Sequence, residues 1–348
     1  MRHVQRIPRP LRRMVAAIAS DAFRAWLRAC DYQVGQMVAT YQHHLALAPP
    51  GWQARLDAIR NTTNLLRHRK RILFYPSLPG PGFIPYKLCL HLGYAITNDP
   101  TAAHHASIKW KNATYAPNDE VITAHVAEGT MLNAALTDIS KRHVMDAFER
   151  TFGYALRVNP HTFTGQIVRK SDLNATHDGV ILQGPLPITA TQGEDSYVYQ
   201  RLVNNVEKGR AQDLRVPIMG DRIPFVRIKY RPVEKRFDYA GQSQIGDEIR
   251  STKEVFSSDE RNRILDLCRA MGLDYGELDV LRDNGDRRIY VVDVNNTPTG
   301  PTFVSANTDT QRAWFDTMAE TFRTLLFTSS DRTVRRLQTA TTVHEEPV

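Results

Sequence analysis

Two short strands joined by a turn are encoded between Leu273 and Pro301, and this stretch constrains the fold more than any other. The first strand covers residues 277–281. The second covers residues 289–295, where apolar and β-branched residues predominate. Asn284-Gly285 stands between them and predicts a tight turn, because both residues tolerate a positive φ. The stretch therefore predicts an antiparallel β-hairpin.

Acidic and amide side chains share one face of this hairpin. Side chains alternate between the faces of a strand, so Glu277 and Asp279 point the same way, as Asp293 and Asn295 do on the second strand. When the strands pair, these oxygens are expected to converge. Such oxygens suit Mg²⁺, which usually binds through one or two carboxylates plus substrate phosphates. A hairpin whose acids simply face water is the alternative interpretation and stays open.

The length and the cysteines limit the class of protein. At 348 residues the chain is long enough for two or three domains with a substantial core. Cys30, Cys89 and Cys268 stand apart, without metal-site spacing, which favours a reducing cytoplasm and no disulfide framework. No apolar run approaches the ~20 residues of a membrane-spanning helix. We therefore expect a cytoplasmic protein with no membrane partner.

The first 71 residues hold the positive charge of the chain. They contain thirteen Lys or Arg against three Asp, a net charge of +10 in a chain whose total is +8. Apolar residues recur every three or four positions from Leu11, which predicts a basic helical extension. Its Arg-rich start is open to three interpretations: a targeting peptide, a basic arm for a phosphate-rich partner, or a solvated helix. Nucleic acid is not expected as a partner except through this segment.

The next unit alternates strand and helix. Ile72–Tyr75 predicts a buried strand, residues 85–92 a helix that ends at Gly93, and residues 94–97 a second strand. This order predicts a βαβ unit with parallel pairing. The Pro- and Gly-rich loop at residues 76–82 does not match GxGxxG, so we do not interpret it as a dinucleotide site.

Two lysines suggest a site for phosphate. Lys170 ends an apolar strand, and a polar loop at residues 171–179 separates it from the next strand. An ammonium there can pair with phosphate oxygens while loop N–H groups cap them. A surface lysine on a hairpin is the alternative. Lys141 stands before a helix expected over residues 142–152, with Ser140 as its N-cap.

A later pair of strands carries alternating basic residues. Arg227, Lys229 and Arg231 share one face of the second strand, beside a partner strand at residues 213–221. This pattern is typical of a solvated cationic face or of a pocket for an anionic or carboxylate substrate. The remaining expected elements are a strand at 197–203, a helix that begins with a capping signature at Ser257 and ends at Gly272, and a last helix at 309–327.

The hairpin resembles the C-terminal metal-binding segment of the ATP-grasp superfamily, which usually has an acid on one strand, then Glu-x-Asn and a Pro-Gly. Here Asp279 precedes Asp293-Val294-Asn295, with Asp for the common Glu, and Pro298 and Gly300 follow. Asp213-x-Arg215 is similar to the subgroup that includes ribosomal-protein glutamate ligase and bacterial glutathione synthetase. The resemblance covers about residues 72–327.

The resemblance implies a role for each matching residue. Lys141 and Lys170 would contact the ATP phosphates, and Gln200 and Leu202 would lie beside the adenine. Asn205 and Glu207 would approach the ribose, and Arg215 would act at the reacting phosphate or acyl group. The implied metal ligands are Asp279, Asp293 and Asn295, and the residues expected to bind the anionic substrate are Arg227, Lys229 and Arg231.

The implied architecture is α/β (α+β): an ATP-grasp fold preceded by a small α/β, Rossmann-like domain and the N-terminal helical extension. The implied domains are residues 1–71, the extension; 72–135, the small domain; 136–200, the first grasp subdomain with the phosphate-binding lysines and loop; 201–328, the second with the metal site; and 329–348, a polar tail.

The implied activity is an ATP- and Mg²⁺-dependent carboxylate–amine ligase that works through an acyl phosphate and releases ADP and phosphate, with Mn²⁺ as an alternative ion. Its partners would be a small-molecule or peptide carboxylate and an amine, and proteins of this class often form homo-oligomers. Two other functions stay open: a small-molecule kinase on the same fold and a nucleotide-binding scaffold that does not catalyse.

Overall fold

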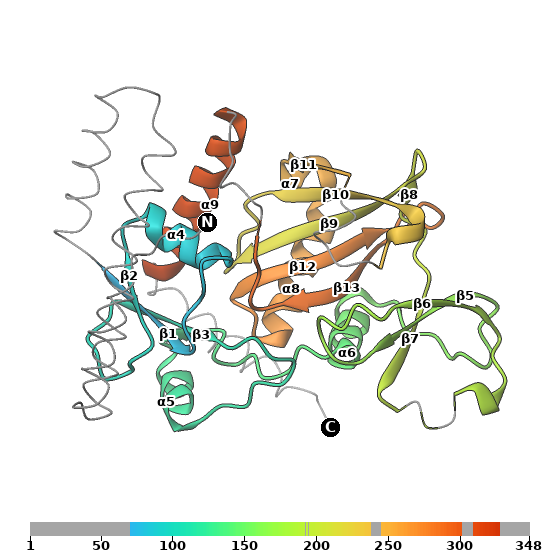
Figure 1. Ribbon diagram of the computed structural model, residues 1–348, viewed down its shortest axis with the longest axis horizontal. Helices are drawn as coiled ribbons and strands as arrows, with labels where there is room; N and C mark the ends of the chain where they lie inside the picture. The colour runs from blue at the N-terminus through green and yellow to red at the C-terminus, as the bar shows by residue number, and fades with distance from the viewer. Residues whose placement is uncertain (1–69, 192, 194, 238–244, 301–308, 328–348) are drawn as a thin grey trace, which may run out of the picture.

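The structure, a computed structural model, describes residues 70–191, 193, 195–237, 245–300 and 309–327. The predicted basic extension and the polar tail lie outside these residues. The described chain forms three β-sheets covered by helices (Figure 1). None of its helices is long and apolar enough to cross a membrane.

The first sheet is small and wholly parallel. Its order is β2 (Ala95–Thr97), β1 (Arg71–Pro76), β3 (Ala106–Trp110) and β4 (Met131–Leu132), with helices α4 (Ile84–His91) and α5 (Glu120–Glu128) in the connections. Strand β1 pairs with β2 and β3 in parallel, which confirms the predicted βαβ pairing. Helix α5, capped by Asp119, was not predicted. The Rossmann-like description of this unit stays a prediction.

The second sheet has three antiparallel strands. The central strand β5 (Gly165–Ser171) pairs with β6 (Val180–Gly184) on one side and with β7 (Tyr197–Arg201) on the other. Figure 1 shows this sheet in green beside the larger one. A short 3-10 helix, η1 (Ile188–Ala190), lies between β6 and β7. The predicted order of strand, polar loop and strand around Lys170 is confirmed.

The third sheet is the largest and is antiparallel. Its order is β11 (Gly246–Arg250), β10 (Val226–Pro232), β9 (Arg210–Met219), β12 (Tyr275–Arg282) and β13 (Ile289–Asn295), and β8 (Val206–Glu207) also pairs with β9. The turn η2 (Val233–Lys235) and the short helix α7 (Thr252–Val255) flank strand β11. Strand β11 was not predicted from the sequence.

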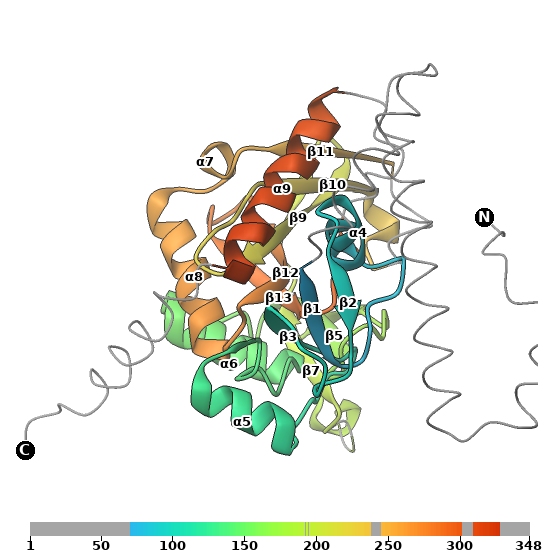
Figure 2. The ribbon, with the colours of Figure 1, turned by 90° about the vertical axis from the view of Figure 1, so that its left-hand side faces the viewer.

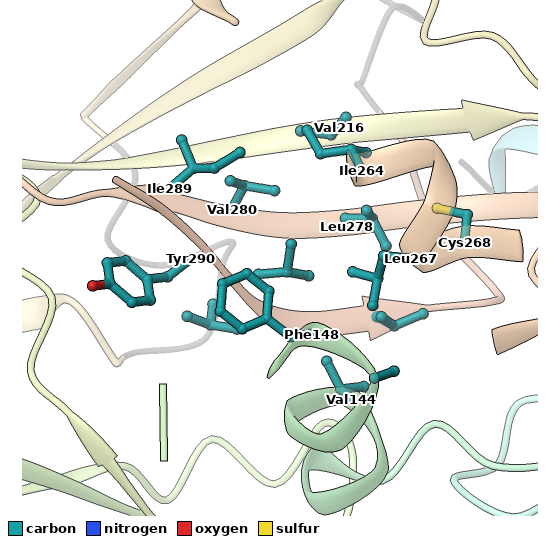
Figure 3. Close-up of a cluster of buried hydrophobic side chains, with 14 of the residues drawn as sticks. Val144, Phe148, Val216, Ile264, Leu267, Cys268, Leu278, Val280, Ile289 and Tyr290 are labelled. Carbon is teal, nitrogen blue, oxygen red and sulfur yellow. The ribbon is translucent and has the colours of Figure 1, made fainter. Parts of the chain in front are cut away.

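One face of the large sheet is apolar and packs against two helices, α6 (Lys141–Phe152) and α8 (Ser258–Met271). Figure 3 shows Val144 and Phe148 of α6 and Ile264 and Leu267 of α8 against Leu278 of β12. Because strands alternate, the residues between these buried positions point to the opposite face. The functional side chains described below come from that second set.

The predicted helix ends are confirmed. Ser140 Oγ accepts from the His143 amide at 3.3 Å, and Ser257 and Glu260 form a full capping box on α8. Gly153 and Gly272 end the two helices with φ of 75°, which a glycine adopts without steric cost.

The last helix joins the small sheet to the large one. Helix α9 (Asp309–Phe327) contacts α4 and strands β3 and β9 (Figure 2). Phe315, Met318 and Phe322 are buried among residues of the small sheet and of the large sheet, as the sequence pattern predicted for this helix. The C-terminal helix therefore returns to the start of the described chain.

The hairpin turn differs from the prediction. The antiparallel pairing of β12 with β13 is confirmed, but neither Asn284 nor Gly285 has a positive φ. Arg287 takes the left-handed conformation instead, with φ of 63°. The Asp283 carboxylate accepts from the Gly285 amide at 2.7 Å, and the Asp283 amide donates to the Arg288 carbonyl at 2.9 Å. The side chain of Asp283 thus shapes a longer loop than a two-residue turn.

Candidate active site

A row of charged residues crosses four strands of the large sheet. The strand register places Arg227 of β10 opposite Arg215 of β9, Arg215 opposite Asp279 of β12, and Asp279 opposite Asp293 of β13. The next row places Glu277 opposite Asn295. All these residues come from the set that faces away from the apolar core. The predicted convergence of the hairpin oxygens on one face is therefore what the pairing produces.

A cavity lies where this face of the large sheet meets the three-stranded sheet and its loop. Most of the residues predicted for a nucleotide site line it together, although they come from α6, β5, β7, β9, β10, β12 and β13. The predicted residues that line it are Lys141, Lys170, Gln200, Leu202, Asn205, Asp213, Arg215, Arg231, Asp279 and Asp293.

Two lysines, Lys141 and Lys170, line this cavity. Lys141 is almost wholly buried, and its Nζ donates to the carbonyl of Leu173, in the loop after β5, at 2.5 Å. Burial lowers the pKa of Lys170, whereas nearby Asp293 raises it and Lys141 lowers it further. Two ammonium groups near one another in a buried setting favour an anionic ligand between them.

The two facing aspartates carry the opposite charge. Burial raises the pKa of Asp293 to about 6, and Asp279 across the strand pair adds to the rise, although Lys141 and Lys170 oppose it. Burial also raises the pKa of Asp213 and of Glu277. These carboxylates are therefore held in an environment that disfavours their own charge and that a cation would stabilise.

Arg215 is fixed by carboxylates. Its guanidinium donates to Asp279 and lies 3.7 Å from Glu277 Oε1. Burial alone would lower the pKa of Arg215, but Asp279 and Glu277 outweigh it and raise the pKa. A guanidinium held this way is positioned before any ligand binds, which suits stabilisation of charge on a transferring group.

The donor set fits Mg²⁺ better than a softer metal. No group of three His, Cys, Asp or Glu in the described chain could hold a metal ion by itself. Asp279 and Asp293 supply two carboxylates, so the other ligands must come from amide oxygens, water or a nucleotide, as is usual for Mg²⁺. Asn295 is less well placed than the two acids. Its Oδ1 accepts from the Thr297 amide at 2.9 Å, and it does not line the cavity.

Part of the cavity lining is apolar. Val168, Leu202, Leu281 and Val292 line the cavity together with Gln200. Gln200 is 2 % exposed, and its Nε2 has no hydrogen-bond partner. A buried polar atom without a partner is costly unless a ligand satisfies it. A planar base with hydrogen-bonding edges fits this environment.

Four predicted residues do not line this cavity: Glu207, Arg227, Lys229 and Asn295. Glu207 lies on β8, where its carboxylate accepts from Gln212, and it lines a smaller neighbouring pocket. Asn205 lines both pockets. Arg227 and Lys229 are buried one strand further along the sheet, so the interpretation of β10 as a solvated cationic face is wrong.

Among the lining residues without a predicted role are Arg236, Phe237 and His177. Phe237 lies so close to Gly179 that a Cβ on that glycine would be 2.9 Å from the ring. In the sequence, Arg236 follows the alternating basic residues of β10, and this pattern was a signal for a role in the site. Arg236 lies in a turn, however, so strand alternation could not predict the direction of its side chain. The pKa of His177 is lowered by burial and then by Arg231 and Arg215.

No protein-family model matches the chain, and no curated protein sequence matches it. The solved structures that match include the ATP-grasp ligase PsnB complexed with a minimal precursor, at 16% identity over 57% of this chain and 68% of that one, with a TM-score of 0.38.

The macrocyclase MdnC from Microcystis aeruginosa, bound with precursor peptide MdnA, is 14% identical over 72% of this chain and 97% of that one, with a TM-score of 0.40. The VanG D-Ala:D-Ser ligase from Enterococcus faecalis is 13% identical over 64% and 73%, with a TM-score of 0.42. PsnB is an ATP-grasp ligase, of the superfamily that the sequence resembles. The similarity is distant, so the geometry of the site carries the functional proposal.

Proposed function

We propose that the chain is an ATP- and Mg²⁺-dependent carboxylate–amine ligase that works through an acyl phosphate. One observation carries the proposal: Arg215, Asp279 and Asp293 lie in register on three adjacent strands and share one cavity with Lys141 and Lys170. Facing carboxylates, two buried ammonium groups and a fixed guanidinium are the parts that phosphoryl transfer from a nucleotide requires.

In this proposal, different residues of the cavity bind different parts of the nucleotide. Gln200 and Leu202 bind the adenine, and Lys141 and Lys170 bind the phosphates. Asp279 and Asp293 would hold Mg²⁺, with Asn295 from the next row of the hairpin as the third protein ligand. When bound, the ion supplies positive charge at the phosphate oxygens. These residues therefore orient the γ-phosphate towards Arg215 and the basic strand β10.

The reaction then proceeds by two substitutions. A substrate carboxylate oxygen attacks the γ-phosphorus, the bond to the bridging oxygen of ADP breaks, and an acyl phosphate forms. Arg215 stabilises the negative charge that spreads over the transferring group. An amine then attacks the acyl carbon, phosphate leaves, and the amine releases its proton to solvent. Catalysis rests on positioning and electrostatics, so no nucleophilic side chain is needed.

The test traps the acyl phosphate. The full chain is incubated with ATP, Mg²⁺, hydroxylamine and mixtures of amino acids, dicarboxylic acids and short peptides. Released ADP and hydroxamates are then measured by mass spectrometry. We expect hydroxamate formation from at least one acid, reduced about 100-fold or more in Arg215→Met. A phosphorylated hydroxyl compound instead of a hydroxamate would assign a kinase. No ADP release above that of Asp293→Asn with any mixture would contradict both activities.

A further inference from the structure

The first turn of helix α4 lies near strands β9 and β10 of the large sheet (Figures 1 and 2). The Ile84 amide donates to the Pro298 carbonyl at 3.2 Å, and a Cβ on Gly300 would lie 2.7 Å from that of Ile84. The carbonyl of Gly300 in turn accepts from Arg227 Nη1 at 3.5 Å. Gly300 therefore stands between α4 and Arg227, which brings the small sheet's helix to the end of the charged row.

Lys87 stands in this first turn, where a cation is unfavourable. The amide groups at a helix N-terminus carry partial positive charge, and acidic residues are preferred there. Helix α4 has no acid in its first turn. Burial and then Arg227 lower the pKa of Lys87. Within the described residues the Lys87 ammonium makes no hydrogen bond or ion pair, so nothing there compensates its charge.

Lys229 extends the positive charge towards the cavity. It is 8 % exposed, and burial followed by Arg215 and Arg227 lowers its pKa to about 8. Its ammonium also has no hydrogen-bond or ion-pair partner among the described residues. The nearby acids already have partners: Glu277 and Asp279 pair with Arg215, and Asp213, which lies opposite Lys229 on β9, pairs with Arg231. Lys87, Arg227 and Lys229 are thus a cationic cluster beside the cavity, not a part of its lining.

We propose that Lys87, Arg227 and Lys229 form a subsite for a second carboxylate of the acid substrate, so that the ligase acts on a dicarboxylate or an acidic peptide. This inference rests on the proposed ligase function. Adjacent strands lie about 4.8 Å apart, which puts the backbone of Arg227 roughly 10 Å from that of Asp279. Arg215 stands between Arg227 and Asp279 in this row, so we assign the carboxylate that attacks the γ-phosphorus to Arg215 and the second carboxylate to Arg227 and Lys87.

The test compares matched acids in the presence of ADP and Mg²⁺. Binding of succinate, glutarate and adipate to the full chain is measured by ligand-observed NMR against butyrate and glutaramate, which carry one carboxylate each. We expect at least one dicarboxylate to bind about tenfold more tightly than the monocarboxylates. Lys87→Met should abolish that preference while calorimetry shows unchanged binding of ADP·Mg²⁺. Lys253→Met, which removes an exposed charge on α7, should keep it.

Several outcomes would overturn the subsite. These are equal binding of both classes of acid, no binding of any probe, a preference that survives in Lys87→Met, or inorganic phosphate bound in place of the dicarboxylates. Lys87→Gln serves as a second variant if the Met variant does not fold. Failure of the ligase proposal would look different, because ADP·Mg²⁺ binding or hydroxamate formation would be absent while the preference for dicarboxylates remained.

Discussion

Asp293, which lies opposite Asp279 across two strands, carries a buried charge that destabilises the ligand-free protein. Burial raises the pKa of Asp293 to about 6, so its ionisation costs more free energy in the folded chain than in the unfolded chain. Proteins commonly accept such local instability where a ligand will bind. At the scale of single residues, we therefore expect the metal site to lower the free energy of unfolding of the metal-free protein.

Replacement of Asp293 by Asn should stabilise the metal-free protein at pH 7. The pKa of Asp293 in the folded chain lies above the usual aspartate value of 3.8, so its contribution to stability is present below about pH 4 and is lost as the pH rises through about 6. Two units of pKa correspond to about 3 kcal/mol as an upper estimate. Thermal unfolding in a chelator should show a higher midpoint for Asp293→Asn at pH 7 and no difference near pH 4.

Asp286, on the loop of the same hairpin, is the matched control. Partial burial alone would raise its pKa, but the hydrogen bond from Tyr290 at 2.6 Å and nearby arginines lower it. Asp286→Asn should therefore destabilise the protein at pH 7, with the opposite sign. A shift of the unfolding midpoint in the same direction in both variants would contradict the claim that the buried charge of Asp293 destabilises the protein.

Gln200 should lower the stability of the ligand-free protein and strengthen its binding of nucleotide. Its Nε2 is buried without a partner, so Gln200→Met removes a desolvation cost of about 1–2 kcal/mol from the ligand-free chain. The same change should weaken ATP binding about tenfold, because the amide no longer meets the base. Thermal unfolding and calorimetry check the two effects. A variant that lost stability but kept its ATP affinity would place Gln200 outside the base site.

At the scale of elements, Gly179 at the end of the loop formed by residues 171–179 lies against Phe237 in the turn after β10. Its backbone conformation is open to any residue, but an added Cβ would lie 2.9 Å from the Phe237 ring. Gly179→Ala should therefore displace Phe237 and weaken binding of ATP·Mg²⁺ several-fold. In a Phe237→Ala background the same change should have little effect, because contacting residues are non-additive. Equal effects of Gly179→Ala in both backgrounds, measured by calorimetry, would show that the contact is irrelevant.

Elements with strong local patterns were the ones that the sequence predicted. The alternation in β9, β10, β12 and β13 separated core residues such as Leu278 from site residues such as Asp279, because a strand repeats every two residues. The capping box at Ser257 marked the start of α8 for a similar local reason. The hairpin turn was misjudged because a side chain, that of Asp283, organises the loop, and Asn284-Gly285 does not.

Contacts between distant segments were not predictable in this way. Nothing near Gly179 in the sequence points to Phe237, and nothing near Lys87 points to Arg227, because tertiary packing alone brings them together. The resemblance to ATP-grasp proteins implied roles for the residues, including Asn295 as a metal ligand and Glu207 near the ribose. Neither Asn295 nor Glu207 lines the cavity.

At the scale of the whole molecule, two of the three sheets enclose the site from different sides. The three-stranded sheet and its loop face the charged row of the large sheet, and α9 ties the small parallel sheet to that same large sheet. The cavity therefore lies where a nucleotide would contact both sheets at once. If this arrangement binds a nucleotide together with Mg²⁺, then nucleotide binding must depend on Asp279 and Asp293.

Calorimetric titration of ATP, with and without Mg²⁺, tests this most directly, on the wild type and on Asp293→Asn, with Asp286→Asn as control. We predict binding that requires Mg²⁺ in the wild type and in the control, and that is lost in Asp293→Asn. Binding that was indifferent to Mg²⁺, or equal in all three proteins, would contradict the metal site. No binding in the wild type, also with a dicarboxylate present, would contradict the ligase itself.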